Sequence, residues 1–294
     1  MPRVYLATTL GATIRKRGFV RIVSGGQSDV GQQRTNNEDC FRIVQPLNLF
    51  VISDGMGGEA HGEVASAMAV DTVVKTCMGE ETGTVADPTE AQLGWSDKTR
   101  RLFNAAHLAN KTIYESAQAN PQQLGMGATL TAAWINEEKL SVVHVGDSRV
   151  YLLRSGVLQQ LTSDHSLVAE QVRRGILTAA EAEHSELQSV LLRALGTQQE
   201  VEIDAEEHSL FPGDILLLCT DGLTRMVAEQ KIAATLQSES DPGRAAEKLV
   251  TLANENGGAD NVTVVVVHMG PKESGFLSWL RHGAQKNAGK NGSA

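Results

Sequence analysis

Cysteine, long apolar runs and positive charge are all scarce in this 294-residue chain. The three cysteines (Cys40, Cys77 and Cys219) lie far apart and form no C-x-x-C pair, which favours a reducing cytoplasm over a disulfide-stabilised secreted protein. No apolar run approaches the ~20 residues of a membrane span, and no basic segment precedes an apolar stretch as in a secretory signal. The net charge of −9 disfavours a general nucleic-acid binder. We therefore expect a cytoplasmic protein with no membrane span and no nucleic-acid partner.

The composition that remains is that of a globular protein, with 41% hydrophobic and 21% charged residues. Residues 1–21 are expected to form a variable lead-in and residues 22–270 one folded domain, with an insertion at about 164–196. Residues 271–294 have the composition of a flexible tail. Within it, the small apolar patch Phe276–Leu280 either docks a partner or packs loosely.

Apolar periodicity divides the domain into helices and strands. Apolar residues at helical spacing predict helices at 59–77, 97–118, 228–237 and 242–256. Runs rich in Val, Ile and Leu predict strands at 19–23, 40–44, 49–53, 128–135, 140–145, 150–154, 157–161, 201–210, 215–219 and 261–268. The tight turns between residues 128 and 161 predict one antiparallel meander. Antiparallel strands together with paired helices indicate an α+β sandwich.

Four aspartates stand at the edges of these apolar strands. Asp54, Asp147 and Asp221 follow strands, whereas Asp260 precedes one. In an antiparallel sheet the end of one strand lies beside the start of the next, so all four can meet at one edge. A carboxylate at a buried rim is costly without a partner, and no comparable set of cations lies beside these four in the sequence. The pattern therefore indicates a site for divalent metal.

Two further segments carry groups suited to phosphate chemistry. The turn Asp54–Gly58 is rich in glycine, which lets the backbone approach a ligand and frees its carbonyls. Upstream, Arg34 offers a rigid fork of donors that suits a phosphate, and Glu38 and Asp39 add adjacent carboxylates. Because each segment alone is more typical of a plain polar turn, the inference depends on their occurring together.

An ordered set of motifs extends this pattern over residues 22–268. The motifs are G-x-x-R-x-x-N-E-D (31–39), D-G-M-G-G (54–58), G-E-V-A-S (62–66), G-M-G-A-T (125–129), H-V-G-D-S-R (144–149), R-A-L-G (193–196), D-G-L (221–223) and D-N-V-T (260–263). One D-G-x-G-G is weak evidence, whereas the ordered set is highly specific. In this respect the chain closely resembles the metal-dependent protein serine/threonine phosphatases of the PP2C type, in particular their bacterial branch.

The resemblance implies a four-layer αββα sandwich, in which two antiparallel β-sheets are flanked by helix pairs. It also implies two Mg²⁺ or Mn²⁺ ions at the sandwich edge, and hard oxygen ligands suit both metals. The residues that would hold these ions are the bridging Asp54, the Gly55 carbonyl at the first ion, Asp221 and Asp260 at the second, and Glu38 and Asp39 mainly through water.

The chemistry that the resemblance implies is hydrolysis without a phosphoenzyme. Two ions lower the pKa of a shared water and so give a hydroxide that attacks phosphorus in line, while Arg34 and the ions offset charge on the phosphoryl oxygens. The catalytic roles fall to Asp54 and Arg34. Some family members have a histidine directly after the Asp-Gly pair, as a proposed general acid. Here Met56 stands there and His61 is better interpreted as a polar residue at a helix start, so metal-bound water would protonate the leaving group.

A third ion is often seen in bacterial relatives, on the aspartates that match Asp147 and Asp221. The family often has another acid four residues after the D-G-L aspartate, where this chain has Arg225. A cation at that position is expected to weaken a third site or to form a salt bridge with Asp147. The sequence therefore leaves a third ion open.

Other polar residues admit two interpretations each. His144 alternates with Val143 and Val145 along a strand, which favours a packed histidine over a ligand. Residues 164–196 are here called the flap, because the resemblance implies that this insertion corresponds to a mobile flap beside the cleft in the family. Within the flap, Asp164–Ser166 and Arg173–Arg174 either contact a phosphopeptide or form a solvated helix face.

The sequence thus predicts Mn²⁺- or Mg²⁺-dependent hydrolysis of phosphoserine and phosphothreonine in proteins. By resemblance, the partners are phosphorylated proteins in signalling, such as a Ser/Thr kinase, its substrates or an anti-sigma-type phosphoprotein, and we expect a monomer. A catalytically weak phosphoprotein-binding module on the same fold is the alternative, disfavoured because the carboxylates and Arg34 are all present. A two-metal nuclease would need a basic groove, which the acidic charge argues against.

Overall fold

The computed structural model describes residues 21–57, 61–80 and 93–270. The predicted tail, nearly all of the lead-in, the end of the glycine-rich turn at 58–60 and most of the loop between the first two helices lie outside the described residues. Among the helices of the described ranges, none combines the length and the apolar character that a bilayer crossing requires.

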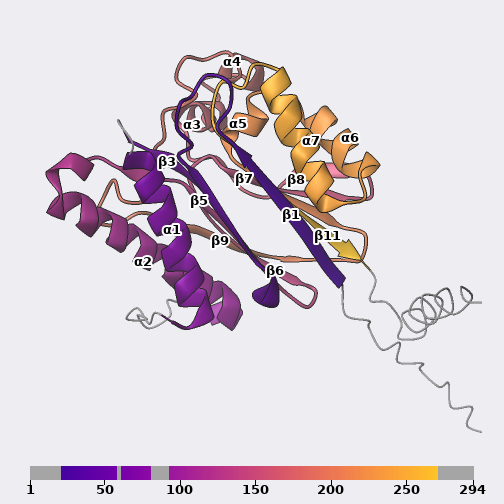
Figure 1. Cartoon of the computed structure of the whole chain (residues 1–294), viewed down its shortest axis with the longest axis horizontal. Helices are drawn as coiled ribbons and strands as arrows, with labels where there is room; N and C mark the ends of the chain where they lie inside the picture. The colour runs from indigo at the N-terminus through magenta and orange to yellow at the C-terminus, as the bar shows by residue number, and fades with distance from the viewer. Residues whose placement is uncertain (1–20, 58–60, 81–92, 271–294) are drawn as a thin grey trace, which may run out of the picture.

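Two antiparallel sheets form the centre of the molecule (Figure 1). The strands of the first sheet are, in spatial order, β1 (Arg21–Asp29), β11 (Val262–Gly270), β10 (Ile215–Cys219), β7 (Arg149–Arg154) and β8 (Val157–Gln160). Those of the second are β2 (Asp39–Val44), β3 (Leu49–Met56), β5 (Leu130–Asn136), β6 (Lys139–Val145) and β9 (Asp204–Ser209), and the short β4 (Gly127–Ala128) pairs with β3.

Helix pairs cover the outer face of each sheet. Apolar side chains of α1 (His61–Met78) and α2 (Asp97–Ala119) pack on the second sheet. Those of α6 (Glu229–Ser238) and α7 (Pro242–Glu255) pack on the first. A third cluster, with Phe50, Val150 and Val265 among its members, fills the space between the two sheets. The result is the predicted four-layer αββα sandwich.

Local sequence sets where the long helices begin. The Ser96 hydroxyl accepts from the Thr99 N–H at the start of α2, and the Asp241 carboxylate accepts from the Arg244 N–H at the start of α7. Pro242 occupies the first turn of α7, where its missing N–H costs nothing. Such caps typically contribute about 1 kcal/mol each, and they explain why the predicted helix starts at 97 and 242 are confirmed.

The predicted meander over residues 128–161 is wrong in one respect, because β6 and β7 belong to different sheets. The chain leaves the second sheet at Gly146, whose φ of 111° favours glycine. A Cβ there would also lie 2.6 Å from the Thr129 side chain. Both β6 and β7 are apolar on both faces, so their sequence pattern is the same whether they pair with each other or belong to different sheets. The short turn between them therefore predicted a hairpin. The consequence is that Asp147 lies at the crossing between the sheets.

The other elements differ from expectation mainly at their ends. β1 is longer than predicted and β9 is shorter. The flap holds the short helices α3 (Leu167–Arg173) and α4 (Ala179–Ala182), which lie at the upper end of the sandwich in Figure 1. The one-turn helix α5 (Asp221–Thr224) was not predicted, and it begins at one of the four rim aspartates.

Candidate functional site

Strand pairing brings the predicted carboxylates to one edge of both sheets. Asp39, the first residue of β2, is the cross-strand partner of Asp54 near the end of β3. Asp221 follows β10, which pairs with β11, and Asp260 stands just before β11. Asp54 of the second sheet lies within hydrogen-bonding reach of Asp221 of the first. Asp147 at the sheet crossing is also close enough to raise the pKa of Asp54.

Burial and mutual repulsion disfavour the charged forms of these groups. Burial raises the pKa of Asp54 well above its ordinary value, and Asp39, Asp221, Asp147 and Asp260 raise it further. Burial also raises the pKa of Asp39 to about 7, although hydrogen bonds from two threonine hydroxyls oppose the shift. Carboxylates held together this way are costly to ionise unless a cation joins them.

The same holds at the Asp147 side of the cluster. Burial and then Asp221 raise the pKa of Asp147 to about 8, while Arg225 opposes the rise. Burial raises the pKa of Asp221 too, again against the opposing charge of Arg225. The cluster therefore spans the crossing between the sheets as well as their strand ends.

Glu38 reaches the cluster through a tight backbone contact. Its carbonyl accepts from the Gly55 N–H at 3.1 Å and from the Ser66 hydroxyl at 2.6 Å. A Cβ at Gly55 would lie 2.0 Å from the Gly62 carbonyl oxygen, and a Cβ at Gly62 would lie 2.4 Å from the Glu38 carboxylate. Glycine at both positions lets β3, α1 and Glu38 meet. Burial raises the pKa of Glu38, while Arg34 lowers it.

Two neighbours that support the carboxylates were not singled out from the sequence. The Thr220 hydroxyl donates to Asp39 at 2.9 Å. The Asn261 side chain accepts from the Glu38 N–H at 2.8 Å and donates to the carbonyls of Val30 and Asn36. Thr220 directly precedes Asp221, and Asn261 directly follows Asp260. The sequence could therefore have identified both residues by their position next to a motif aspartate.

Two arginines reach the cluster from different sides. The guanidinium of Arg34, with its side chain 52% exposed, donates to Asp260 at 2.9 Å. The guanidinium of Arg225 lies 2.5 Å from Asp221, 3.8 Å from Asp147 and 3.9 Å from Asp260. The predicted contact between Arg225 and Asp147 is present, but the closest partner of Arg225 is Asp221.

The donor set fits divalent metal in chemistry, although its present spacing does not form a finished ligand group. Within the described ranges, no three acidic, histidine or cysteine side chains lie close enough together to hold a single ion. Arg225 lies between three of the aspartates, Asp147, Asp221 and Asp260. One oxygen of Asp39 and one of Asp221 are nevertheless buried without a hydrogen-bond partner. Buried, orphaned carboxylate oxygens beside further carboxylates are ligands that Mg²⁺ and Mn²⁺ accept.

The residues with two interpretations mostly have structural surroundings. His144 is 1% exposed and hydrogen-bonded to Thr131, so it is a packed histidine as predicted. In the flap, Asp164 pairs with Arg149, and His165 is buried. Arg173 and Arg174 both pair with Glu170 on the exposed side of α3, which favours the solvated helix face. Cys219 is fully buried, and all three cysteines are free.

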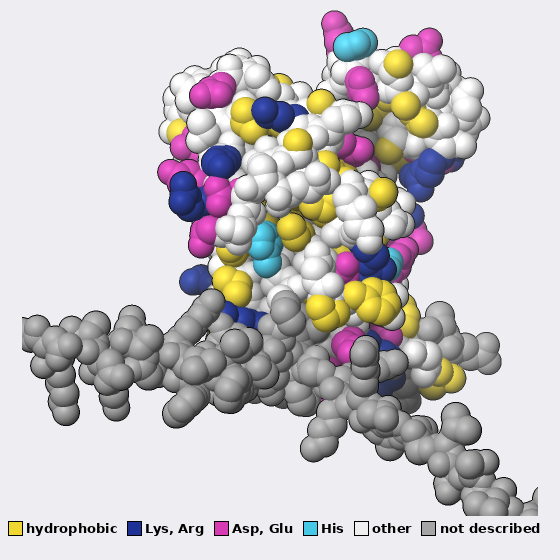
Figure 2. All heavy atoms as spheres, turned by 90° about the vertical axis from the view of Figure 1, so that its right-hand side faces the viewer, with side chains coloured by type: hydrophobic (Ala, Val, Ile, Leu, Met, Phe, Trp, Pro, Cys, Tyr) yellow, Lys and Arg dark blue, Asp and Glu magenta, His cyan; other side chains and the backbone are white. Residues whose placement is uncertain are grey.

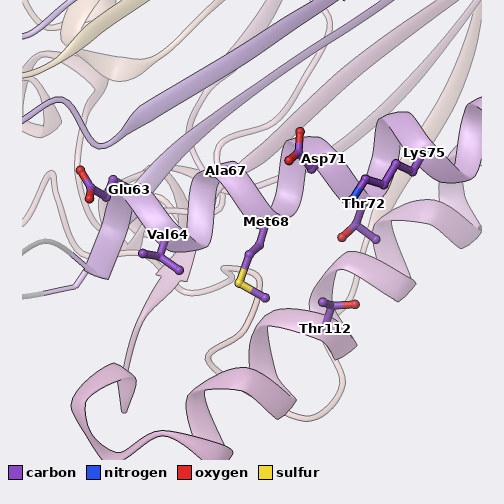
Figure 3. A pocket seen from close by; sticks show the side chains of 8 residues that line it. All are labelled: Glu63, Val64, Ala67, Met68, Asp71, Thr72, Lys75 and Thr112. Atoms are coloured by element: carbon purple, nitrogen blue, oxygen red, sulfur yellow. The ribbon is translucent and has the colours of Figure 1, made fainter.

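One surface hollow of the described residues lies away from the carboxylates. A hollow of about 640 Å³ lies between α1 and α2, lined by residues from Glu63 to Lys75 and by Thr112, and it includes none of the predicted ligands (Figure 3). On the face in Figure 2, Lys and Arg side chains stand beside Asp and Glu side chains and form no single basic surface. This mixed charge does not support a nuclease, which would need a basic groove.

Comparison with known proteins places these features in a family. A family model described as "Protein phosphatase 2C" matches residues 25–254. The chain is 36% identical over 252 residues to "Serine/threonine phosphatase stp" of Listeria innocua, a match that covers 85% of this chain and 96% of the relative. It is 34% identical over 250 residues to "Protein phosphatase PhpP" of Streptococcus pneumoniae, covering 84% and 97%.

Solved structures agree with the sequence relatives. The crystal structure of the Mycobacterium tuberculosis serine/threonine phosphatase PstP/Ppp superposes with a TM-score of 0.74 at 36% identity, covering 85% of this chain and 99% of that one. The catalytic domain of PstP in complex with two manganese ions gives a TM-score of 0.73 at 35% identity, covering 86% and 99%.

Proposed function

The chain belongs to the protein phosphatase 2C family and is a protein serine/threonine phosphatase, and we propose that its clustered carboxylates bind the divalent metal ions with which phosphate is hydrolysed. The observation that carries this proposal is the convergence of five buried or half-buried aspartates from both sheets, two of them with orphaned oxygens. A manganese-bound relative with the same fold supports it.

Six residues would hold two ions. Asp54, the Gly55 carbonyl, Asp221 and Asp260 would bind them directly, and Glu38 and Asp39 would bind through water. When bound, the ions would polarise the phosphoryl group and lower the pKa of water enough to give a nucleophile near neutral pH. Mn²⁺ and Mg²⁺ are both candidates by ligand chemistry.

The protein's own groups prepare this site before substrate arrives. The Thr220 hydroxyl holds the Asp39 carboxylate and the Asn261 side chain holds the Glu38 backbone, so little reorganisation is left for the reaction. Arg34 stands at the half-exposed rim, where its planar fork can leave Asp260 and bind two phosphoryl oxygens. Its charge then offsets the negative charge of the phosphoryl group in the transition state.

The finer parts of the proposal concern ion number and substrate. A third ion would use Asp147 and Asp221 beside Arg225, which stands where the family often has a further acid, and the missing carboxylate favours two ions over three. The proposed substrates are phosphorylated proteins in the cytoplasm, among them a Ser/Thr kinase or its substrates, and the proposed acting form is a monomer that takes part in signalling.

The Asp54→Asn variant tests the proposal. With Mn²⁺ the wild-type protein is expected to hydrolyse an aryl phosphate and a phosphothreonine peptide, and the variant is expected to lose about 100-fold or more in kcat/KM on both, because an electrostatic group of the site is neutralised. Removing metal with a chelator should have a similar effect.

The matched control is Asp71→Asn, an exposed aspartate of α1 that pairs with Arg42. It should keep wild-type activity. Asp54→Asn should also unfold no earlier than the wild type without metal, because it removes a buried repulsive charge. A wild-type protein that stays inactive with both metals across pH would contradict the proposed mechanism.

A further inference from the structure

Arg225 lies directly over the edge where the sheets meet. It follows α5, and its N–H donates to the carbonyl of Asp221, four residues before it. This turn brings its side chain back over Asp221, where the two charged groups approach to 2.5 Å. Asp147 from the sheet crossing and Asp260 from the start of β11 lie just beyond, at 3.8 and 3.9 Å.

The positive charge of Arg225 thus faces three carboxylates, of which Asp260 also pairs with Arg34 at 2.9 Å. The side chains of Asp147 and Asp221 are 9% and 11% exposed, whereas the Arg225 side chain is 25% exposed and has an open side toward solvent. A single guanidinium cannot neutralise three carboxylates, and one oxygen of Asp221 has no hydrogen-bond partner. Arg225 therefore pairs with Asp221 but leaves one of its carboxylate oxygens without a hydrogen bond.

We propose that Arg225 is a resident counter-cation that competes with divalent metal for Asp221. Without metal it holds Asp147, Asp221 and Asp260 together against their mutual repulsion, and when metal binds it gives up Asp221 and turns toward solvent. This inference rests on the proposed function, because that function takes Asp221 as a metal ligand.

The competition has two measurable consequences. The free energy of breaking the contact between Arg225 and Asp221 is subtracted from the free energy of metal binding, so Arg225 weakens the apparent metal affinity. A hydrogen bond between charged groups corresponds to about tenfold or more in affinity. Conversely, the metal-free fold depends on Arg225, whereas the metal-bound fold does not, since the ions take over its role.

The Arg225→Met variant tests this, because methionine removes the charge and keeps much of the side-chain length. Calorimetric titration with Mn²⁺ alone should show about tenfold or tighter binding than in the wild type. Thermal unfolding should show a lower midpoint without metal and a larger rise of the midpoint on adding Mn²⁺. Arg225→Lys keeps a cation but loses the planar fork, so its affinity should lie between the two.

Arg154→Met is the matched control. Arg154 lies at the end of β7 that is away from the carboxylate cluster. It forms a bidentate salt bridge with Asp214, whose side chain is 3% exposed. Its loss should lower the midpoint equally with and without Mn²⁺ and leave the Mn²⁺ affinity unchanged. A purely structural role for Arg225 would give this control pattern.

Equal or weaker Mn²⁺ binding by Arg225→Met and Arg225→Lys would overturn the inference. If Arg225→Met does not fold without metal, the Mn²⁺ affinity of Arg225→Lys is measured instead. Binding by Arg225→Lys that is no tighter than that of the wild type would then overturn the inference. These outcomes differ from failure of the proposed function, in which the wild-type protein itself binds no Mn²⁺.

Discussion

At the scale of single residues, burial decides which ionisable groups carry charge. His144 on β6 is 1% exposed, and its Nε2 has no hydrogen-bond partner among the described residues. Burial and the neighbouring His165 lower its pKa to about 4. A neutral imidazole three residues from Asp147 adds no positive charge to the cluster, so the compensation comes from the arginines and, in our proposal, from metal.

This gives a prediction about pH. The folded-state pKa of His144 lies below the unfolded value of about 6.5, so the unfolded chain binds more protons between pH 6.5 and 4 and stability falls as pH falls. From pH 7 to pH 5 this group should remove about 2 kcal/mol of unfolding free energy. His144→Leu should reduce the pH-dependent loss by that amount in urea unfolding at the two pH values. An unchanged pH dependence would contradict it.

At the scale of elements, close approach of backbones positions the candidate ligands. The first turn of α5 lies against the start of β11, where a Cβ on Gly222 would fall 1.9 Å from the carbonyl oxygen of Asn261. That contact brings Asp221 beside Asp260, and Asn261 in turn binds the backbone of Glu38. Three candidate ligands therefore depend on one glycine between a helix and a strand.

Gly222→Ala should separate these two elements. The methyl group must displace backbone, so we expect a loss of about 1–3 kcal/mol in unfolding free energy together with weaker Mn²⁺ binding in calorimetry. Gly94→Ala is the control, since a Cβ there meets nothing within 4 Å, and it should change stability by no more than about 1 kcal/mol, in the stabilising direction. Wild-type metal affinity in Gly222→Ala would refute the role given to this contact.

At the scale of the whole molecule, the site depends on how the two sheets are stacked. Asp39 and Asp54 belong to the second sheet, whereas Asp221 and Asp260 adjoin the first. The apolar cluster between the sheets, which includes Ile135, fixes their relative position. The candidate metal centre therefore exists only when both sheets are packed together.

Ile135→Val should weaken this packing by about 1 kcal/mol, the usual result of removing one buried methyl group. The control is Ile176→Val in the flap, where the side chain is 63% exposed and no measurable change is expected. Urea unfolding followed by far-UV circular dichroism measures both. Equal stability of the two variants would show that the cluster between the sheets carries less of the fold than its burial indicates.

Motif order and apolar periodicity were enough to anticipate much of this protein. The long helices and most strands were predicted because their period and their caps are local signals, whereas the four-layer architecture was implied by the family resemblance of the motifs. The meander was wrong at Gly146–Ser148, since two strands that are apolar on both faces look alike whether they pair or part. The helix α5 was missed because one turn is too short to show a period.

The sequence shows which kinds of chemical group are available at the candidate site: carboxylates in D-G and D-N turns, and one arginine whose donors suit a phosphate. Which of them meet cannot be read from the sequence, because Asp54 and Asp221 are neighbours only through the stacking of two sheets, which is a contact between distant segments. The same holds for Arg225. The sequence shows that this residue is positively charged, but it lies closer to Asp221 than to Asp147 because of the turn after α5 and the crossing between the sheets at Asp147. Local sequence sets residue type and period, whereas distances across the sandwich arise from packing.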